Sequence, residues 1–175
     1  MCGARASQFR RWRREVIWGE ANDGNAFYGL DGVSGHAGLF GAAADLARYG
    51  QLWLNDGDLN GTPLFGRSLA REAIQPVVAG RGLGWRLQGG TPTPETPAVA
   101  PTFGPRAFGH TGFTGTSLWI DPDRELVAVL LSNRLHPIAR PEIATIRPAY
   151  HAALAAAIPV ARPRSDHALA GGVHD

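Results

Sequence analysis

The chain has 175 residues, of which 44% are hydrophobic and 18% are charged. This length corresponds to about one domain, and the composition is sufficient for a sizeable core and excludes wholesale disorder. All 17 basic residues are arginine, and the formal net charge of only +2 argues against nucleic acid or a membrane surface as a partner.

The first 28 residues show no clean helical or strand period, so we expect an irregular segment there. Within it, Arg5–Arg14 holds five arginines and no acid and could contact an anionic surface. Replacement of lysine by arginine throughout the chain is the simpler explanation of this cluster. No charged leader followed by an apolar run opens the sequence, so we expect no secretion signal and, by default, a cytoplasmic location. Asn22–Asn25 is predicted to form a turn, because Asn, Asp and Gly tolerate the required backbone angles.

Two helices and a short strand are expected next. A glycine-rich stretch, Gly29–Gly41, leads into the clearest helix at Ala42–Asn55, where apolar residues recur at helical spacing and Asp56–Gly57 supply the stop. The second helix spans Arg67–Gln75 and ends before a proline. After it, Leu83–Leu87 alternates like a short strand.

The second half of the chain changes to a sheet pattern. Gly89–Pro105 carries five prolines and is expected to be a loop. Thr114–Ile120 and Leu126–Ser132 are rich in β-forming residues, and the turn chemistry of Asp121–Arg124 between them predicts an antiparallel hairpin. A final helix follows at Pro141–Ile158. Its predicted apolar stripe consists of Ile143, Ile146, Tyr150, Leu154 and Ile158.

The order of helices, then strands, then a helix favours an α+β fold with an antiparallel sheet over a parallel βαβ array. No period of 20–50 residues recurs, so a repeat architecture is excluded. The longest apolar stretch, Ala149–Ala161, is interrupted and too short for a membrane span, which needs about 20 residues. We expect residues 1–158 to form one partial domain and residues 159–175 a disordered tail.

The absence of lysine excludes several chemistries within these residues. A Walker-type phosphate loop, a pyridoxal Schiff base and a Ser-x-x-Lys nucleophile all require that amine. The single cysteine, Cys2, forms neither an internal disulfide nor a cysteine-based zinc site. The six histidines show no metal-ligand spacing, so we expect no metal and no cofactor.

One serine superficially resembles a nucleophile. Gly32–His36 is similar to the Gly-x-Ser-x-Gly elbow around Ser34, but His36 occupies the place of the second glycine. The elbow also requires a strand directly before its serine, and the glycines and aspartate preceding Ser34 make a poor strand. We therefore expect Ser34 not to act as a nucleophile.

Two segments resemble a known family. Gly35–Tyr49 is similar to the "GHAGLFSTAADLARF" stretch of the β-lactamase-related serine hydrolases. Gly109–Thr116, continuing into Leu118–Pro122 and Leu131–Pro137, is similar to the third motif of that family and its flanking strands. The family includes class C β-lactamases, penicillin-binding proteins, esterases and D-amino-acid peptidases. The matching segments cover most of residues 20–155.

The resemblance implies an α/β sandwich in which helices flank an antiparallel sheet and the C-terminal helix packs on it. In these enzymes a Ser-x-x-Lys serine attacks a carbonyl, a Tyr-x-Asn motif relays protons, and a Lys/His-Thr-Gly strand edge closes the site. His110, Thr111 and Gly112 correspond to that third motif. By this resemblance, His110 would polarise or hydrogen-bond the substrate, Thr111 would orient it, Gly112 would admit it close to the backbone, and the Phe113 N–H would be an oxyanion donor.

Two departures from the family pattern bear on activity. The first and second motifs would lie well before residue 20, and the family's usual "HDEN" reads Asn22–Asn25 here, so an acid is replaced at Gly24. We therefore expect the C-terminal half of a serine hydrolase, the C-terminal part of a β-lactamase-like sandwich. Such a chain would be inactive alone and would take a small-molecule carbonyl substrate only when an N-terminal half completes it.

Other interpretations stay open. The chain could be a non-catalytic binding module whose sheet edge around His110–Phe113 accepts a partner strand or a second copy. It could also be a marginally folded product of a truncated gene, whose exposed apolar surface favours aggregation. Residue by residue, His110 could simply cap a strand, and His36 is expected to have a structural role in the glycine-rich loop. Trp85 and Trp119 are expected to pack, and His151 on the last helix is expected to be a surface or helix-packing residue.

Overall fold

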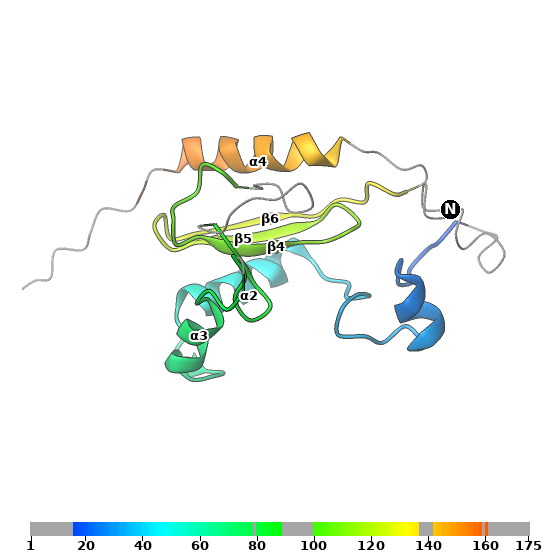
Figure 1. Cartoon of the computed structure of the whole chain (residues 1–175), viewed down its shortest axis with the longest axis horizontal. Coiled ribbons are helices and arrows are strands. Elements are labelled where there is room, and N and C mark those ends of the chain that lie inside the picture. The colour runs from blue at the N-terminus through cyan, green and yellow to red at the C-terminus, as the bar shows by residue number, and fades with distance from the viewer. Residues whose placement is uncertain (1–15, 79, 89–99, 137–141, 159, 161–175) are drawn as a thin grey trace, which may run out of the picture.

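The computed structural model describes residues 16–78, 80–88, 100–136, 142–158 and 160. In this part of the chain an antiparallel sheet lies between helices (Figure 1). This arrangement confirms the predicted α+β class. The arginine-rich segment Arg5–Arg14, most of the predicted loop Gly89–Pro105 and nearly all of the predicted tail lie outside the described residues.

The described residues form helical and extended elements in two sheets. The helical elements are η1 (Asn25–Gly29, a π-helical turn), α2 (Ala43–Leu54), α3 (Arg67–Ala73) and α4 (Ile143–Ala157). The main sheet has the order β3–β4–β5–β6, formed by Arg86–Leu87, Phe108–Thr111, Ser117–Asp121 and Leu126–Leu130. A separate hairpin pairs β1 (Asp58–Leu59) with β2 (Thr62–Pro63).

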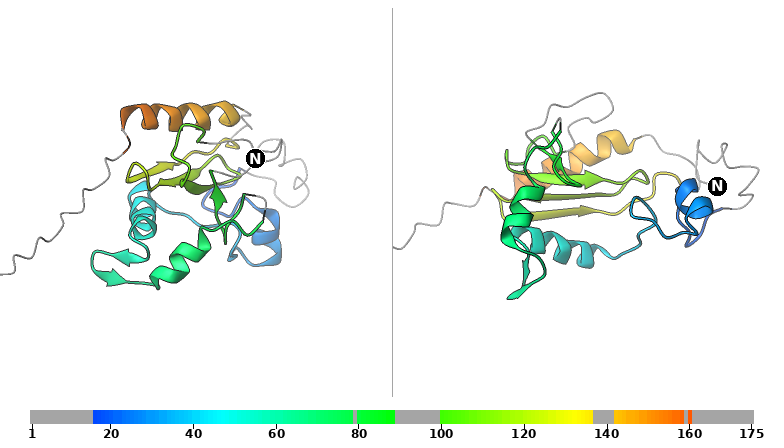
Figure 2. Two further views of the ribbon diagram at one scale, coloured as in Figure 1. Left: turned by 60° about the vertical axis from the view of Figure 1, so that its left-hand side comes forward. Right: turned by 60° about the horizontal axis from the view of Figure 1, so that its bottom comes forward.

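The two faces of the main sheet are covered by different helices, α2 on one and α4 on the other (Figures 1 and 2). Because side chains alternate along a strand, Trp119 and Ala128 face α4, where Leu154 packs against them. Phe108 and Ile120 face the opposite side, which α2 and α3 cover. The sheet is therefore buried on both faces, as the continuous apolar run of β6 predicts.

An aromatic cluster joins α2 to the sheet. The rings of Trp53 and Trp85 lie 5.1 Å apart and those of Trp85 and Phe108 lie 5.3 Å apart, both in edge-to-face geometry. Such pairs add stability beyond the area that they bury. Trp85 and Trp119 are both buried, which confirms the prediction that these tryptophans pack.

Helix α4 matches its prediction in extent but not in its whole apolar face. Ile143 is buried and Leu154 packs on the core, whereas Ile146 is 50% exposed, so its place in the predicted stripe is wrong. The inward positions near the middle of the helix are held instead by Arg147 and His151, and His151 is completely buried. A polar layer therefore interrupts the apolar face of α4.

Two strands and one hairpin differ from the expectation. The strand predicted at Leu83–Leu87 is limited to its last two residues, because Gly84 adopts a φ of +78°. The strand predicted from Thr114 begins at Ser117, because the residues before it form a turn. The β1–β2 hairpin was not predicted, although Asn60–Gly61 between its strands, with φ of 55° and 84°, is the usual sequence of a two-residue turn.

The predicted turn Asp121–Arg124 between β5 and β6 is confirmed, and a buried carboxylate organises it. Asp121 accepts hydrogen bonds from the backbone N–H groups of Gly104 and Asp123, at 2.9 and 3.0 Å. Its other contact is an ion pair with Arg124 at 2.8 Å. A buried charge is tolerated when hydrogen bonds and an opposite charge compensate it, and Asp121 has both. The turn thereby fixes the register of the hairpin that places β5 beside β6.

Candidate functional site

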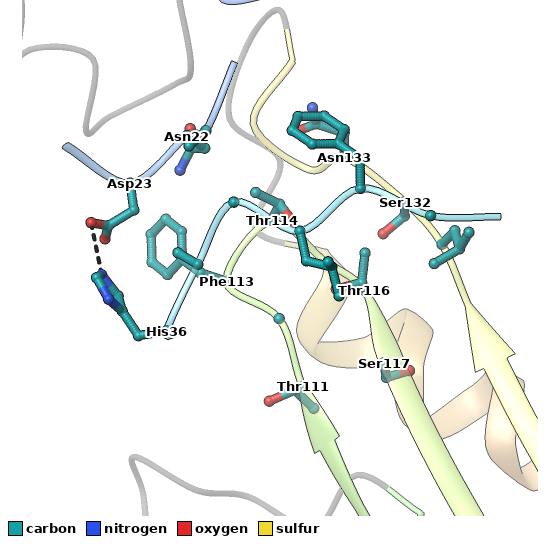
Figure 3. A pocket seen from close by; sticks show the side chains of 18 of the residues that line it. Asn22, Asp23, His36, Thr111, Phe113, Thr114, Thr116, Ser117, Ser132 and Asn133 are labelled. Carbon is teal, nitrogen blue, oxygen red and sulfur yellow. Dashed lines mark hydrogen bonds and ion pairs between the residues drawn. The ribbon is translucent and has the colours of Figure 1, made fainter. Parts of the chain in front are cut away.

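A cavity of about 810 Å³ lies at the end of the sheet where β4 ends and β5 begins (Figure 3). Its walls come mainly from four parts of the chain, residues 20–24, 36–41, 110–118 without Gly115, and 131–133, together with Ile17 and Leu46. A cavity of a few hundred to a thousand cubic ångströms is typical of a small-molecule site. The end of the sheet is therefore the candidate site.

The cavity brings together the two segments that the sequence analysis singled out. Loop 36–41, which leads into α2, forms one wall, and residues 110–114 at the end of β4 form the wall facing it. Gly24, where the usual acid of the "HDEN" pattern is replaced, also lines the cavity. Segments about seventy residues apart in the sequence thus meet at one place, as their common resemblance implies.

His110 is the third residue of β4, and its side chain lies on the cavity wall although part of it stays exposed. The Nδ1 atom lies 3.0 Å from the backbone carbonyl of Thr111. Partial burial lowers the pKa of His110, the Thr111 carbonyl opposes this by favouring the protonated ring, and the charges of Arg81 and Arg86 lower the pKa further. The imidazole is therefore neutral at neutral pH, and its Nε2 is available for a hydrogen bond with a ligand.

The next residues of the motif leave the strand and form a tight turn. Thr111 is the last residue of β4, and the Gly112 N–H donates to the carbonyl of Thr116 at 2.8 Å. The Gly115 N–H donates back to the Gly112 carbonyl at 3.2 Å, which closes the turn. Phe113 therefore lies in a turn two residues beyond β4, and its side chain points into the cavity wall (Figure 3).

His36 connects the glycine-rich loop to the segment before η1. Its Nε2 lies 3.1 Å from Oδ1 of Asp23, and the same carboxylate oxygen accepts the Ala26 N–H at 2.9 Å (Figure 3). These contacts, led by the Ala26 N–H, lower the pKa of Asp23. His36 thus has the loop-anchoring contacts expected of it, and it also forms part of the cavity wall.

Ser34, His36 and Asp23 follow one another in the side-chain order of a nucleophilic triad, with 2.5 Å between Ser34 Oγ and His36 Nδ1. The serine hydroxyl oxygen, however, also accepts the backbone N–H of His36 at 3.2 Å, which is a local turn contact. Ser34 is not among the residues that line the cavity. That Ser34 does not act as a nucleophile therefore stays a prediction.

A buried polar pair lies directly behind the cavity. Ser117, the first residue of β5, lines the cavity and its Oγ lies 3.1 Å from Nε2 of His151 on α4. Burial first, and then the charge of Arg147, lowers the pKa of His151 to about 4. His151 is therefore neutral at physiological pH and holds the start of β5 against α4.

Several cavity residues were not singled out from the sequence. They are Asn22, Thr114, Thr116, Ser117, Leu131, Ser132 and Asn133. The last three belong to the quoted segment that continues the third motif, so the resemblance contained a signal for them. Thr114 and Thr116 belong to the quoted segment Gly109–Thr116, whereas Ser117 lies just outside it and had no signal, because the turn between β4 and β5 was not anticipated.

Within the described residues, no three His, Cys, Asp or Glu side chains lie close enough together to hold a metal ion. The same part of the chain contains no helix that is both long enough and apolar enough to cross a membrane.

Comparison with known proteins matches residues 3–153 to the family described as Beta-lactamase. A protein of Salmonella typhi named "Putative D-alanyl-D-alanine carboxypeptidase" is 39% identical over 142 residues, which are 77% of this chain and 32% of the relative. A protein of the same name from Salmonella newport matches with the same identity and coverage. The chain thus spans about a third of the length of these curated relatives.

A solved structure, a beta-lactamase from Mycobacterium bovis, superposes with a TM-score of 0.50 at 22% sequence identity. The superposition covers 69% of this chain and 46% of that one. At this identity the likeness concerns the fold, and it agrees with the predicted sheet flanked by helices.

Proposed function

Because the chain belongs to the beta-lactamase family, we propose that its cavity is the substrate-binding wall of a serine acyl-transfer site whose nucleophile lies outside these 175 residues. One observation supports this most. The cavity unites loop 36–41 with residues 110–114, which are the two segments whose sequences resemble the family. The chain contains no lysine, so a Ser-x-x-Lys motif has to come from residues outside it.

In the proposed reaction, an external serine oxygen adds to the substrate carbonyl carbon and loses its proton to the base beside it. The carbonyl oxygen becomes negative, and the backbone N–H of Phe113 donates a hydrogen bond to it. The leaving group departs as the carbonyl reforms and takes up a proton. Water then hydrolyses the acyl-serine ester by the same two steps. This chain contributes hydrogen-bond donors and the cavity wall, and the segment outside these 175 residues contributes the serine oxygen that forms the bond.

His110 and Thr111 are the proposed substrate contacts beside this donor. His110 is neutral and its Nδ1–H donates to the Thr111 carbonyl, so its other ring nitrogen, Nε2, is unprotonated and can accept a hydrogen bond from a ligand. Gly112 has no side chain, and a Cβ there would clash with Oγ1 of Thr116. The bare backbone lets a substrate approach the turn closely.

We propose small D-peptides as the substrate class, with ester and lactam carbonyls as the alternatives that the family also accommodates. The Salmonella relatives carry the name of a D-alanyl-D-alanine carboxypeptidase, and the cavity is large enough for a dipeptide and its neighbouring groups. Phe40 and Phe113 supply apolar surface, while His110 and Thr116 supply polar contacts. A mixed lining of this kind suits a peptide with small apolar side chains.

A second candidate is a non-catalytic binding module on the same scaffold. Strand β3 pairs only with the first two residues of β4, Phe108 and Gly109, so β3 does not cover the edge at His110 and Thr111. Leu39 and Phe40 at the cavity wall are 92% and 67% exposed. In the part of the chain that the structure describes, this strand edge lies beside exposed apolar residues, which favours strand addition by a partner chain or by a second copy.

We propose that the cavity wall in this chain binds the substrate by itself, although turnover needs the completing segment. Titration of the isolated chain with N-acetyl-D-alanyl-D-alanine, followed by amide resonances in NMR spectra, tests the proposed function. We expect saturable shifts confined to residues 36–41 and 110–117, and weaker binding by about tenfold in His110→Ala, because one hydrogen bond to the ligand is lost. His136→Ala, at an exposed position that does not line the cavity, is the matched control and should bind as the wild type does. Shifts that fail to saturate, or that spread over α2 and α3, would contradict the placement of the site.

A further inference from the structure

The turn that carries the proposed oxyanion donor is held by an arginine on the opposite side of the sheet from loop 36–41. Arg147 projects from α4, and its guanidinium donates to three backbone carbonyls of the β4–β5 turn. Its Nε lies 3.1 Å from the Gly115 oxygen, and Nη2 contacts the oxygens of Gly112 and Thr116, the latter at 3.0 Å. One rigid planar group thus fixes both ends of a five-residue turn.

These contacts orient the backbone of the turn more than they stabilise the fold. Arg147 is half-buried, and among the residues that the structure describes no carboxylate forms an ion pair with it. Burial lowers its pKa, and the charges of Arg134 and Arg86 lower it further, so the cation is held at a cost in desolvation. Three carbonyl dipoles converging on one charge compensate that cost only while the turn keeps its shape.

Peptide planarity converts this anchoring into a direction at the cavity. In a trans peptide the C=O of one residue and the N–H of the next lie in one plane and point in opposite directions. The Gly112 carbonyl is directed at Arg147 on the α4 side of the sheet, so the Phe113 N–H is directed away from α4. The side chain of Phe113 lines the cavity (Figure 3). By the same argument, the Gly115 carbonyl accepts a hydrogen bond from Arg147, so the N–H of Thr116 is directed away from α4.

A second arginine fixes the next peptide plane. Nε of Arg134 donates to the Phe113 carbonyl at 2.7 Å, and its guanidinium carbon lies 4.6 Å from the centre of the Phe113 ring. The peptide planes before and after Phe113 are therefore each bound to a guanidinium. Phe113 has little freedom to rotate its N–H away from the direction that Arg147 sets.

We propose that Arg147 is a positioning residue, which holds the Gly112–Thr116 turn from α4 so that the Phe113 N–H faces the substrate carbonyl oxygen. Arg147 lies behind the turn and does not touch the substrate, and its effect reaches the site only through backbone geometry. The role of the Phe113 N–H as an oxyanion donor rests on the proposed function, but the anchoring of the turn by Arg147 is testable without any substrate.

The test compares Arg147→Met and Arg147→Lys with the control Arg48→Met, which removes an exposed arginine of α2 that pairs with Asp45. Amide resonances are recorded for each variant with and without N-acetyl-D-alanyl-D-alanine. In both Arg147 variants we expect shifted or broadened amides at residues 112–116 and probe binding weakened by about tenfold, because the donor loses its alignment. Lysine keeps the charge but is a point donor without the planar fork, so it should not restore binding.

Each outcome decides the proposal. Full rescue by lysine would overturn it, because charge alone would then suffice. Unchanged amides at residues 112–116 in either variant would overturn it as well, whatever the probe does. If the wild-type chain binds no probe, the proposed function fails, and the anchoring role is judged on the amide resonances alone. If Arg147→Met does not fold, Arg147→Lys carries the comparison.

Discussion

Replacing Gly109 by alanine is expected to destabilise the chain by about 3 kcal/mol or to prevent folding, because the new methyl group has no space. A Cβ at this position would overlap the backbone oxygen of Leu118 and lie 2.6 Å from the indole ring of Trp119. The backbone oxygen belongs to the β4–β5 ladder, and Trp119 is 2% exposed, so neither can retreat without disrupting the core. Because Gly109 directly precedes His110, the cavity wall should be lost with it.

Urea unfolding followed by tryptophan fluorescence measures this effect, and Gly41→Ala is the matched control. A Cβ at Gly41 would meet no atom within 4 Å, and this glycine has no left-handed backbone angle, so its substitution should change stability by less than about 0.5 kcal/mol. Equal stability of Gly109→Ala and wild type would contradict the packing of β4 against β5. A broad, non-cooperative wild-type transition would favour the marginally folded interpretation instead.

Acidification from pH 6.5 to pH 4 should cost about 3 kcal/mol of stability through His151 alone. The native pKa of about 4 lies below the ordinary value of 6.5, because burial and the charge of Arg147 disfavour the protonated ring. As the pH falls through this window the unfolded chain binds a proton at the imidazole and the native chain does not, so the free energy of unfolding decreases. Below pH 4 both states are protonated, and this contribution to the slope ends.

The variant His151→Gln isolates this effect, since glutamine is uncharged throughout the window and can still hydrogen-bond to Ser117. We expect a shallower loss of stability between pH 6.5 and pH 4 than in the wild type, measured by urea unfolding at each pH. His136→Gln, which changes an exposed histidine, should retain the wild-type slope. Parallel curves for wild type and His151→Gln would contradict a neutral, buried His151.

The sequence predicts correctly those elements whose local residue pattern agrees with their place in the fold. The helix now seen at Ala43–Leu54 and the turn at Asp121–Arg124 follow from periodicity and turn chemistry alone. The α+β class followed from their order, and the family followed from two short motifs. These signals are local, and the fold did not override them.

The polar layer beneath the site could not be predicted, because no local pattern encodes it. Arg147 and His151 interrupt an otherwise apolar helix face, and their partners lie more than thirty residues earlier in the chain. A helical period cannot distinguish an inward-facing arginine from a solvated one, so Ile146 was placed inward and proved exposed. The β4 strand was likewise indicated only by the family motif. It has four residues, of which Gly109 is a weak strand former and Thr111 is the last, so its local pattern is too short to predict a strand.

The central claim is that this chain supplies one wall of an acyl-transfer cavity while the attacking serine lies in residues outside these 175. Intact-mass spectrometry after incubation with benzylpenicillin and, separately, with a fluorophosphonate ester tests it most directly. The account predicts an unchanged mass in both samples, because none of the serines here is followed by the lysine that would activate it. A stoichiometric adduct that peptide mapping places on Ser34, Ser117 or any other serine of the chain would contradict it.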